Sequence, residues 1–394
     1  MKILLLSFYY QPDLSAGSFR TTALVKSLLD SLPRNAHVEV ITTLPNRYNS
    51  FSLKAPLLEQ HPRLTVHRIP LSEHKSGMLD QSRAFLGYLK GVLKITKNNN
   101  YSVVYATSSR LMTAALGALV SKRVRSPLYL DIRDIFVDTI KDVLPSRFAR
   151  LAKPLFSLIE RLTIQAATKV NLVSAGFLPY FQERYPGKAF EVFTNGIDSE
   201  FIQAQPLEET FSQSDVLTVL YAGNMGEGQG LHEIIPGVAR SLDGRIKFRL
   251  IGDGGRKQQL KDAVDSAFCQ NVVIDIPVRR EELITAYQAA DVLFLHLNDY
   301  DAFRKVLPSK IFEYAALGKP IWAGVAGYSA DFIRQFVPNA TVFSPCNVEE
   351  AVAAFSSLSL VTKPRHEFIE RFSRVKIMQE LASDIIELAK SEAR

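Results

Sequence analysis

Short apolar runs alternate with amphipathic stretches of helical period through the first half of the chain. The runs are rich in Val, Ile and Leu, so each one predicts a buried strand. The predicted strands are residues 2–8, 38–42, 64–69, 103–106, 128–132, 170–173 and 191–193. Apolar strands separated by helices are typical of a parallel sheet covered on both faces. The first half is therefore predicted to be a doubly wound α/β domain whose ligand binds at the carboxyl ends of the strands.

The same pattern restarts after a polar stretch at 204–214 that is typical of a linker. The strands predicted there are residues 216–222, 247–251, 272–274, 292–297, 320–323 and 341–343. The tail from 364 onward is helical with no strand after it. We therefore predict two Rossmann-like domains, 1–196 and 197–365, and C-terminal helices at 366–394 that pack back toward the first domain.

The stretch 307–321 places one carboxylate and one ammonium on a short helix that leads into a buried strand. Lys310 and Glu313 are three residues apart, so they share a helix face, and Gly318 ends the helix. The start of this helix, at Ser309 and Lys310, offers free backbone N–H groups to an anion. Glu313 is suited to accept hydrogen bonds from two neighbouring hydroxyls, as on a ribose. The alternative is an exposed carboxylate paired with Lys310.

Three glycine-rich turns follow predicted strands, at Gly17, at 223–230 and at 252–255. Such turns let backbone N–H groups approach a phosphate at a helix start. None has the spacing of a dinucleotide fingerprint or a P-loop, so each alone could be a plain turn. Arg256 and Lys257 open the helix after the last turn. They could neutralise a diphosphate, or they could be a solvated first turn.

Asp131, Arg133 and Asp134 close a strand of the first domain and put two carboxylates around a guanidinium. This group could be a base with its orienting partner, or a clamp for a sugar. The alternative is a structural ion network that caps the strand end.

Metal ligands are sparse in the sequence. Asp299 and Asp301 form a DxD that would hold a divalent cation in another transferase fold, but a solvent loop is favoured here. The two cysteines form no CxxC and the seven histidines no HxxxH. The sequence therefore predicts no metal cofactor and a reducing compartment.

The net charge of +7 hides an asymmetry. Residues 1–196 hold 26 Lys and Arg against 13 Asp and Glu, a net charge of +13, and the remainder has a net charge of −6. A basic half favours an anionic surface or substrate, and no basic motif interleaved with aromatic residues supports nucleic acid. The N-terminal apolar run is too short for a signal peptide, and no later run is long enough for a spanning helix.

Residues 147–162 form a basic amphipathic pattern. Its apolar side comprises Phe148, Leu151, Leu155, Leu158 and Leu162. A helix of this kind can lie on an anionic membrane. The alternative is a surface helix that covers the sheet.

Taken together and in this order, the motifs resemble the retaining glycosyltransferases of the GT-B fold, family 4, and most closely bacterial enzymes that add amino sugars to surface polysaccharides. The motifs are the loop of Gly17 and Arg20, the 131–134 segment, 194–198, 221–226, 251–254 and the Glu313 helix ending at 318–320. The resemblance implies two Rossmann-like domains facing across a cleft. It also implies retention of anomeric configuration and no obligatory metal.

By that resemblance, a UDP-sugar would bind the second domain and a polyprenyl-diphosphate-linked saccharide the first, at the cytoplasmic face of the inner membrane. Glu313 would hold the ribose, and the glycines would admit the diphosphate, whose departure basic groups would stabilise. The candidate substrate-binding residues are Gly17, Arg20, Asn195, Gly223, Asn224, Gly226, Gln229, Gly252, Gly254, Arg256, Lys257, Lys305, Ser309 and Glu313. The candidate catalytic residues are Asp131, Arg133, Asp134 and Lys310.

The chain departs from the family pattern at three places. Lys305 stands where many relatives have a second glutamate, and Asn224 and Gln229 stand where many have Arg and Lys. Many relatives also carry a histidine near the position of Asp131. A UDP-sugar 2-epimerase of the same architecture and a non-catalytic nucleotide-sugar-binding partner therefore remain as alternatives.

Overall fold

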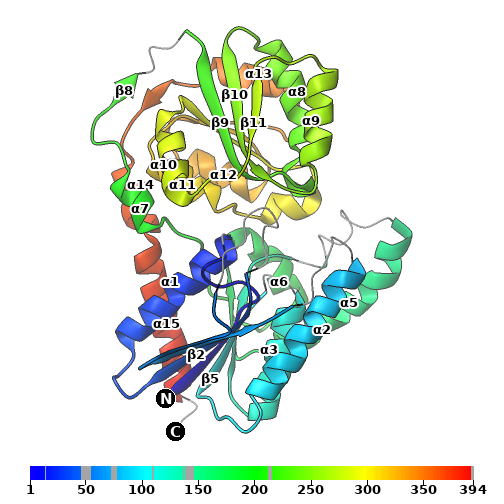
Figure 1. Cartoon of the computed structure of the whole chain (residues 1–394), viewed down its shortest axis with the longest axis vertical. Helices are drawn as coiled ribbons and strands as arrows, with labels where there is room; N and C mark the ends of the chain where they lie inside the picture. Colours follow the sequence, from blue (N-terminus) through cyan, green and yellow to red (C-terminus); the bar gives the residue numbers. More distant parts are fainter. Residues whose placement is uncertain are drawn as a thin grey trace. The chain divides into compact units, whose positions relative to one another are not determined.

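In the computed structural model of the chain, two open sheets organise two separate units (Figure 1). The first unit comprises Met1–Thr194 and Val375–Arg394, and the second comprises Asn195–Arg374. The structure describes the chain except residues 14, 46–54, 72–77, 109–110, 136, 138–145, 212–214 and 392–394, and except the side chains of 78–82, 146–152 and 211.

The first sheet has seven strands in the order β3-β4-β2-β1-β5-β6-β7. Their bounds are β1 (Lys2–Leu6), β2 (His37–Thr43), β3 (Leu58–His61), β4 (Leu64–Ile69), β5 (Val103–Thr107), β6 (Leu128–Ile132) and β7 (Lys169–Leu172). All pairs are parallel except the β3–β4 hairpin at one edge. Ile3 lies between Val38 and Val103 in register, and all three are fully buried. Strand β1 is therefore the centre of this sheet.

Helices cover the faces of the first sheet. They are α1 (Ala16–Ser31), α2 (Met78–Ile95), α3 (Leu111–Val124), α5 (Ser146–Ala166), α6 (Leu178–Arg184) and α15 (Arg374–Ser391), with a 3₁₀ turn η1 (Ala175–Phe177). Although α15 closes the chain, its apolar stripe belongs to the same core cluster as α1, β1 and β2. Its stripe has helical period and includes Ile377, Leu381 and Ile385, each buried.

The second sheet has six parallel strands in the order β11-β10-β9-β12-β13-β14. Their bounds are β9 (Leu217–Asn224), β10 (Ile246–Asp253), β11 (Val272–Asp275), β12 (Val292–His296), β13 (Ile321–Gly324) and β14 (Ala340–Phe343). The helices around it are α7 (Ser199–Gln203), α8 (Leu231–Ser241), α9 (Lys257–Ser266), α10 (Arg280–Ala289), α11 (Lys310–Ala316), α12 (Tyr328–Phe336), α13 (Val348–Ser356) and α14 (His366–Phe372). Two 3₁₀ turns, η2 (Glu227–Gln229) and η3 (Asp301–Lys305), follow β9 and β12. Separate core clusters fill the two faces of this sheet.

The predicted α/β class with two Rossmann-like domains is confirmed, and the differences are local. Strand β3 was not predicted because its residues are polar and its side chains mostly exposed, as edge strands often are. Residues 191–193 form only an isolated bridge, from Glu191 to Asn171. The predicted linker contains β8 (Thr210–Phe211), which pairs with β15 (Val361–Thr362). No helix in the described part of the chain is both long and apolar enough to cross a membrane.

Candidate functional site

The strand order of the second sheet reverses between β9 and β12. The chain runs outward from β9 through β10 to β11, and then continues through β12 on the opposite side of β9. Ligands of open α/β sheets bind outside the carboxyl ends of the strands at such a point. The residues that follow β9 and β12 are therefore the first candidates for a site.

Gly223, near the end of β9, gives a lysine side chain access to the strand end. Its φ of +141° is one that residues with side chains rarely adopt. A Cβ atom on Gly223 would lie 2.5 Å from both Cε and Nζ of Lys310. The Lys310 amine also lies 5.3 Å from the ring centroid of Tyr221, within cation–π range. A side chain at position 223 would displace this amine, so the position of the Lys310 amine depends on a glycine at 223.

The turn after β9 is closed by its own amide side chains. The Asn224 Nδ2 group donates to Gln229 Oε1 at 2.7 Å, and the Gly226 N–H donates to the same oxygen at 3.2 Å. From β12, Asn298 donates its side-chain amide to the Glu227 carbonyl at 3.0 Å. Asn224 and Gln229 therefore shape the turn, and a contact of either one with substrate stays a prediction.

Glu313 lies half-buried on α11 among charged side chains of the second unit. Burial raises the pKa of its carboxyl, and the positive charges of Arg280 and Lys310 act against that rise. Arg280 is itself ion-paired with Asp198. Asp198 also pairs with Arg374, at 2.5 Å between Oδ1 and Nε. The carboxylate of Glu313 therefore sits in a network of acids and bases drawn from distant parts of the second unit.

The turn after β10 is a packing feature. A Cβ atom on Gly252 would lie 1.9 Å from the Gly223 carbonyl oxygen, and one on Gly254 would lie 2.6 Å from backbone atoms of Met225. These glycines allow the ends of β9 and β10 to touch. The Lys257 amine donates to the Gly252 carbonyl at 2.8 Å, so it caps the strand end.

Arg256 is exposed beside the same turn. Its guanidinium forms an ion pair with Glu227 and donates to Gln259 at 2.7 Å. Because the guanidinium and Gln259 are exposed and Glu227 is half-buried, the guanidinium could exchange these partners for a phosphate at small cost. Diphosphate binding by Arg256 or Lys257 stays a prediction.

The segment between β12 and α11 packs against the turn that follows β9. Phe303 of η3 lies against Gly228, where a Cβ atom would be 2.8 Å from its ring. Lys305, at the end of η3, and Ser309, just before α11, are both half-buried. A sugar contact by either residue stays a prediction.

Asp299 and Asp301, the predicted solvent-loop acids, have exposed side chains that pair with Arg304. Within the described ranges, no cluster of three or more His, Cys, Asp or Glu side chains could hold a metal ion.

His296 contacts the last residue of the 3₁₀ turn η2, which follows β9. It is fully buried, with Nδ1 2.7 Å from the Gln229 carbonyl and Nε2 accepting from the Cys346 N–H at 2.9 Å. The two contacts assign a neutral ring with the proton on Nδ1. Burial lowers the pKa of His296 to about 4, in agreement with a neutral ring.

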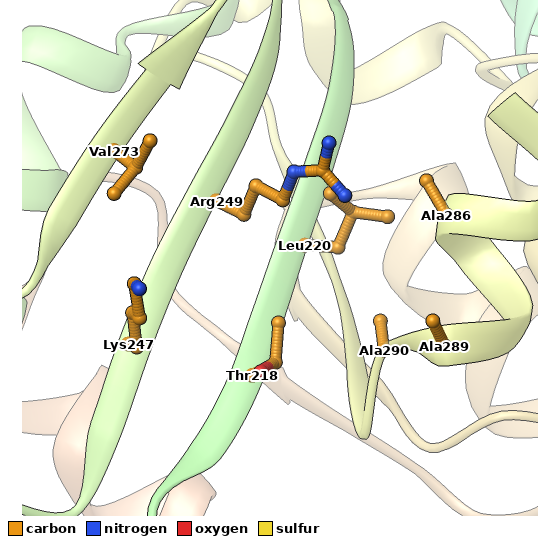
Figure 2. Close-up of a pocket in the computed structure, with 8 residues that line it drawn as sticks. All are labelled: Thr218, Leu220, Lys247, Arg249, Val273, Ala286, Ala289 and Ala290. Atoms are coloured by element: carbon orange, nitrogen blue, oxygen red, sulfur yellow. The ribbon is translucent and has the colours of Figure 1, made fainter. Parts of the chain in front are cut away.

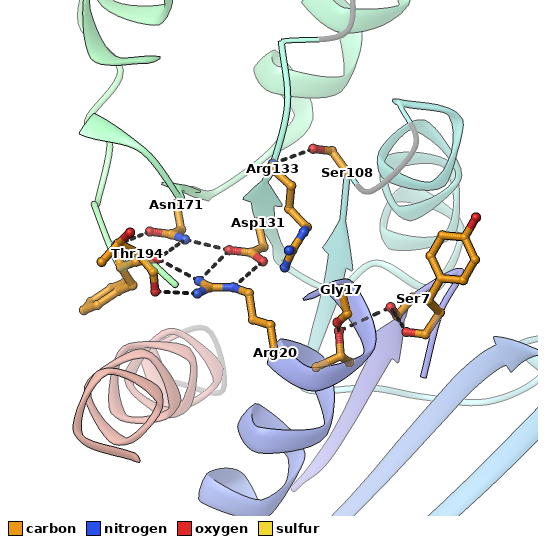
Figure 3. A network of polar contacts seen from close by, with 11 residues as sticks. Ser7, Gly17, Arg20, Ser108, Asp131, Arg133, Asn171 and Thr194 are labelled. Carbon is orange, nitrogen blue, oxygen red and sulfur yellow. Dashed lines mark hydrogen bonds and ion pairs between the residues drawn. The ribbon is translucent and has the colours of Figure 1, made fainter. Parts of the chain in front are cut away.

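In the first unit, Arg20 and Asp131 form a buried ion pair (Figure 3). Arg20 donates to both carboxylate oxygens at 2.9 and 3.0 Å, and to the carbonyls of Phe193 and Thr194 at 2.8 and 2.7 Å. Asn171 donates to Asp131 at 2.6 Å. Neither charged side chain has exposed surface. This burial favours a structural role for both residues, and the substrate contact of Arg20 and catalysis by Asp131 stay predictions.

The other predicted residues of the first unit differ in surroundings. Gly17 is buried in the first turn of α1, where its carbonyl accepts from Thr21. The backbone N–H of Arg133 donates to Ser108 Oγ at 2.9 Å. The Nη1 atom of the Arg133 side chain is buried without a hydrogen-bond partner among the described residues. Asp134 is exposed. Catalysis by Arg133 or Asp134 stays a prediction.

Asn195, a predicted substrate-binding residue, opens the second unit. The residue is 5% exposed, and its side-chain Oδ1 has no hydrogen-bond partner among the residues that the structure describes. The adjacent Gly196 touches Arg374, whose Cα would lie 2.6 Å from an added Cβ. The segment is thus tightly held, and its contact with substrate stays a prediction.

A separate hollow of about 300 Å³ lies on the face of β9 and β10 beside α10 (Figure 2). It is lined by small and apolar side chains together with Lys247 and Arg249. Arg249 is already paired with Asp275 at 2.8 Å. Lining of this kind has no convergent set of polar groups, so we do not assign the hollow to the site.

Two family models match consecutive parts of the chain. Residues 21–196 match the glycosyl transferase 4-like domain, and residues 205–374 match the glycosyl transferases group 1. The chain belongs to the GT-B glycosyltransferases.

Two relatives of this glycosyltransferase are bacterial transferases by name. It is 22% identical over 295 residues to the 2-deoxystreptamine N-acetyl-D-glucosaminyltransferase of Niallia circulans, covering 70% of this chain and 73% of the relative. It is 26% identical over 175 residues to WcaI of Escherichia coli K12, a glycosyl transferase assigned by name to colanic acid biosynthesis. That match spans 42% of each chain, so the glycosyltransferase aligns with less than half of WcaI.

Solved structures share the fold of this glycosyltransferase along its whole length. Anabaena HepE in complex with UDP and glucose has a TM-score of 0.67 at 18% identity, over 98% of this chain and 100% of that one. WaaG, a glycosyltransferase involved in lipopolysaccharide biosynthesis, has a TM-score of 0.63 at 15% identity, over 100% and 98%. At these identities the likeness establishes the fold.

Three residues of the candidate site were not indicated by the sequence motifs. Arg280 and Arg374 lie in ordinary helical sequence and reach the Glu313 network only through folding. His296 gave a usable signal, since a polar residue at the end of an apolar strand faces the place where ligands of parallel sheets bind.

Proposed function

We propose that this glycosyltransferase transfers a sugar, an N-acetylated amino sugar, from a UDP-sugar to a polyprenyl-diphosphate-linked saccharide during synthesis of a bacterial surface polysaccharide. The observation that carries the donor part of the proposal is the grouping of Gly223, Lys310 and Glu313 where the strand order reverses. The named relatives, an N-acetylglucosaminyltransferase and a colanic acid enzyme, support the sugar and the pathway class.

In this proposal Lys310 acts on the leaving group. Its amine lies at the end of β9, in the space that Gly223 leaves open and within cation–π range of the Tyr221 ring. When the bond from the anomeric carbon to the UDP oxygen breaks, negative charge accumulates on the diphosphate. A fixed cation at that point stabilises the transition state more than the ground state.

Glu313 is proposed to bind the ribose. A carboxylate accepts two hydrogen bonds from neighbouring hydroxyls without rearrangement. Arg280 and Lys310 favour its charged form against the effect of burial. No enzymic nucleophile is needed if the leaving phosphate oxygen takes the proton of the acceptor hydroxyl, and we propose retention of configuration on that basis. The proposed reaction uses no metal.

Donor binding is tested by calorimetric titration with UDP and UDP-N-acetylglucosamine. Hydrogen bonds to a charged group contribute roughly 1.5–3 kcal/mol, so Glu313→Ala is expected to weaken binding about 10- to 150-fold. Glu281→Ala removes an exposed carboxylate from α10 and serves as the matched control. Equal affinities of Glu313→Ala and the control would contradict the ribose assignment.

Transfer is tested separately with a polyprenyl-diphosphate saccharide and labelled UDP-sugar. Product with the donor's anomeric configuration, determined by NMR, is expected. An epimerised UDP-sugar that forms without acceptor, and no transferred sugar, would instead identify a 2-epimerase. Tight UDP-sugar binding with neither product would identify a binding partner without catalysis.

A further inference from the structure

Helix α5 has its leucines on the outside. Leu155, Leu158 and Leu162, spaced i, i+3 and i+7, expose 58%, 52% and 58% of their surface. The side of α5 that packs on the sheet instead carries Glu160 and Thr163, which are 5% and 3% exposed. Helix α5 therefore covers the sheet, as the sequence alternative has it, but the three leucines that the structure describes do not face the sheet. Phe148 and Leu151 lie outside the described side chains.

The inward carboxylate shows that this orientation is built into the unit. Glu160 accepts hydrogen bonds from the Tyr180 and Tyr185 hydroxyls at 3.1 and 3.0 Å. Rotating α5 to bury its leucines would break both bonds and move a carboxylate to a new environment. A surface helix normally turns its apolar stripe to the core, so the outward stripe of α5 requires another explanation.

Two neighbouring helices repeat the arrangement. Helix α2 packs on α3, and α3 packs on α5 (Figure 1). Leu119 of α3 is 49% exposed, with exposed Lys122 and Arg123 three and four residues later. Leu86 of α2 is 53% exposed, with exposed cations at the same helical spacings on either side of it. These spacings place each leucine and its cations on one helix face.

The charge on this leucine-and-cation face has one sign. Among the described side chains of α2, α3 and α5, the exposed charged residues are Arg83, Lys90, Lys94, Lys122, Arg123, Lys153 and Arg161. The same described side chains include no exposed Asp or Glu. Solvated surface helices usually mix both signs of charge. Exposed leucines among cations alone fit the boundary of an anionic bilayer, where apolar side chains enter the acyl region and cations meet the headgroups.

We propose that the outer face of α2, α3 and α5, centred on the leucine stripe of α5, docks on an anionic lipid bilayer. This inference deepens the proposed function, because it names the surface that would bring the enzyme to a lipid-linked acceptor. The inference rests on the proposed function only for the lipid-linked acceptor. Vesicle binding itself needs neither donor nor acceptor.

The test is co-sedimentation of the full chain with vesicles of phosphatidylcholine containing about 30% phosphatidylglycerol, an anionic lipid that attracts Lys and Arg to the surface. Leu155→Gln, Leu158→Gln and Leu162→Gln are combined in one variant, since Gln has nearly the helix propensity of Leu. We expect at least a tenfold lower partition coefficient with an unchanged melting temperature. The matched control combines Leu207→Gln, Val216→Gln and Ile276→Gln, three exposed apolar residues of the second unit, and should bind like the wild type.

The cations give a second readout. Lys122→Gln and Arg123→Gln should each weaken binding about fivefold, and binding should fall as salt screens the headgroups. Wild-type chain that ignores the vesicles at low salt would overturn the proposal. So would a stripe variant that binds normally, or a wild-type dimer in sedimentation equilibrium that the stripe variant turns into a monomer.

Failure of docking and failure of the proposed function are separable. Titration of UDP-N-acetylglucosamine in the absence of vesicles reports donor binding alone, and the stripe variant should retain it.

Discussion

Removing the Asp131 carboxylate distinguishes a structural acid from a catalytic one. In Asp131→Asn the Arg20 guanidinium stays in a site with no exposed side-chain surface, and it loses the charge that two of its hydrogen bonds reach. Breaking a buried ion pair by removing one partner costs about 3–5 kcal/mol. For a unit of this size, each kcal/mol shifts the melting temperature by roughly 2–4 °C. The first unit is therefore expected to melt about 6–20 °C lower.

The assay is scanning calorimetry together with transfer activity at 20 °C. Calorimetry is chosen because two units can unfold in separate transitions, and a single transition must not be assumed. The double variant Arg20→Met/Asp131→Leu removes both charges at once and should recover most of the loss, because apolar replacement of a buried pair is often neutral or stabilising. An Asp131→Asn protein with the wild-type melting temperature and no activity would refute the structural role and restore the catalytic one.

Three further predictions concern the turn at β9 and the titration of buried groups. Gly223→Ala should displace the Lys310 amine and weaken UDP-sugar binding at least tenfold in calorimetric titration, whereas Gly255→Ala, which meets nothing within 4 Å, should bind normally. Although burial opposes it, hydrogen bonds from its partners lower the pKa of Glu39 to about 2. About 3 kcal/mol of unfolding free energy is therefore present above pH 4.5 and lost as the pH falls toward 2, and Glu39→Gln should flatten that acid limb in urea titrations. Burial lowers the pKa of His296 to about 4. Between pH 6.5 and 4 the imidazole is therefore protonated in the unfolded chain and neutral in the folded chain. The free energy of unfolding should fall by about 3 kcal/mol over this range. A His296→Gln protein that keeps this slope would contradict the assignment.

Much of the fold was predictable because parallel strands are buried on both faces. Such strands form continuous apolar runs, and the runs at β1, β5 and β9 needed no long-range information. Strand β3 lies at an edge of the sheet and consists mostly of polar residues, so it forms no apolar run that would predict a strand. The direction of α5 was not predictable either. Periodicity groups Leu155, Leu158 and Leu162 on one side, but only the tyrosines that bind Glu160 show which side faces inward.

The site was predictable where a local rule applied. A strand-end turn points to Gly223 and a short helix points to Lys310, and the structure brings the two residues together. The roles of Arg20 and Asp131 could not be predicted. An Arg in the first helix and an Asp at a strand end suit a substrate as well as they suit each other, and only the structure shows that both side chains are fully buried. Asp131 and Arg20 are 111 residues apart in sequence, so no motif joins them.

The charge of Glu313 depends on more than its nearest cations. Burial raises the pKa of this carboxyl, and Arg280 and Lys310 act against the rise. Asp198 adds a second negative charge that raises the pKa further, yet it also pairs with Arg280 and so holds that cation in place. Arg374 balances Asp198 by pairing with its other oxygen. Asp198 therefore holds Arg280 in position, and Arg374 offsets the negative charge of Asp198. The surroundings of the Glu313 carboxylate are thus built from several separate segments of the second unit.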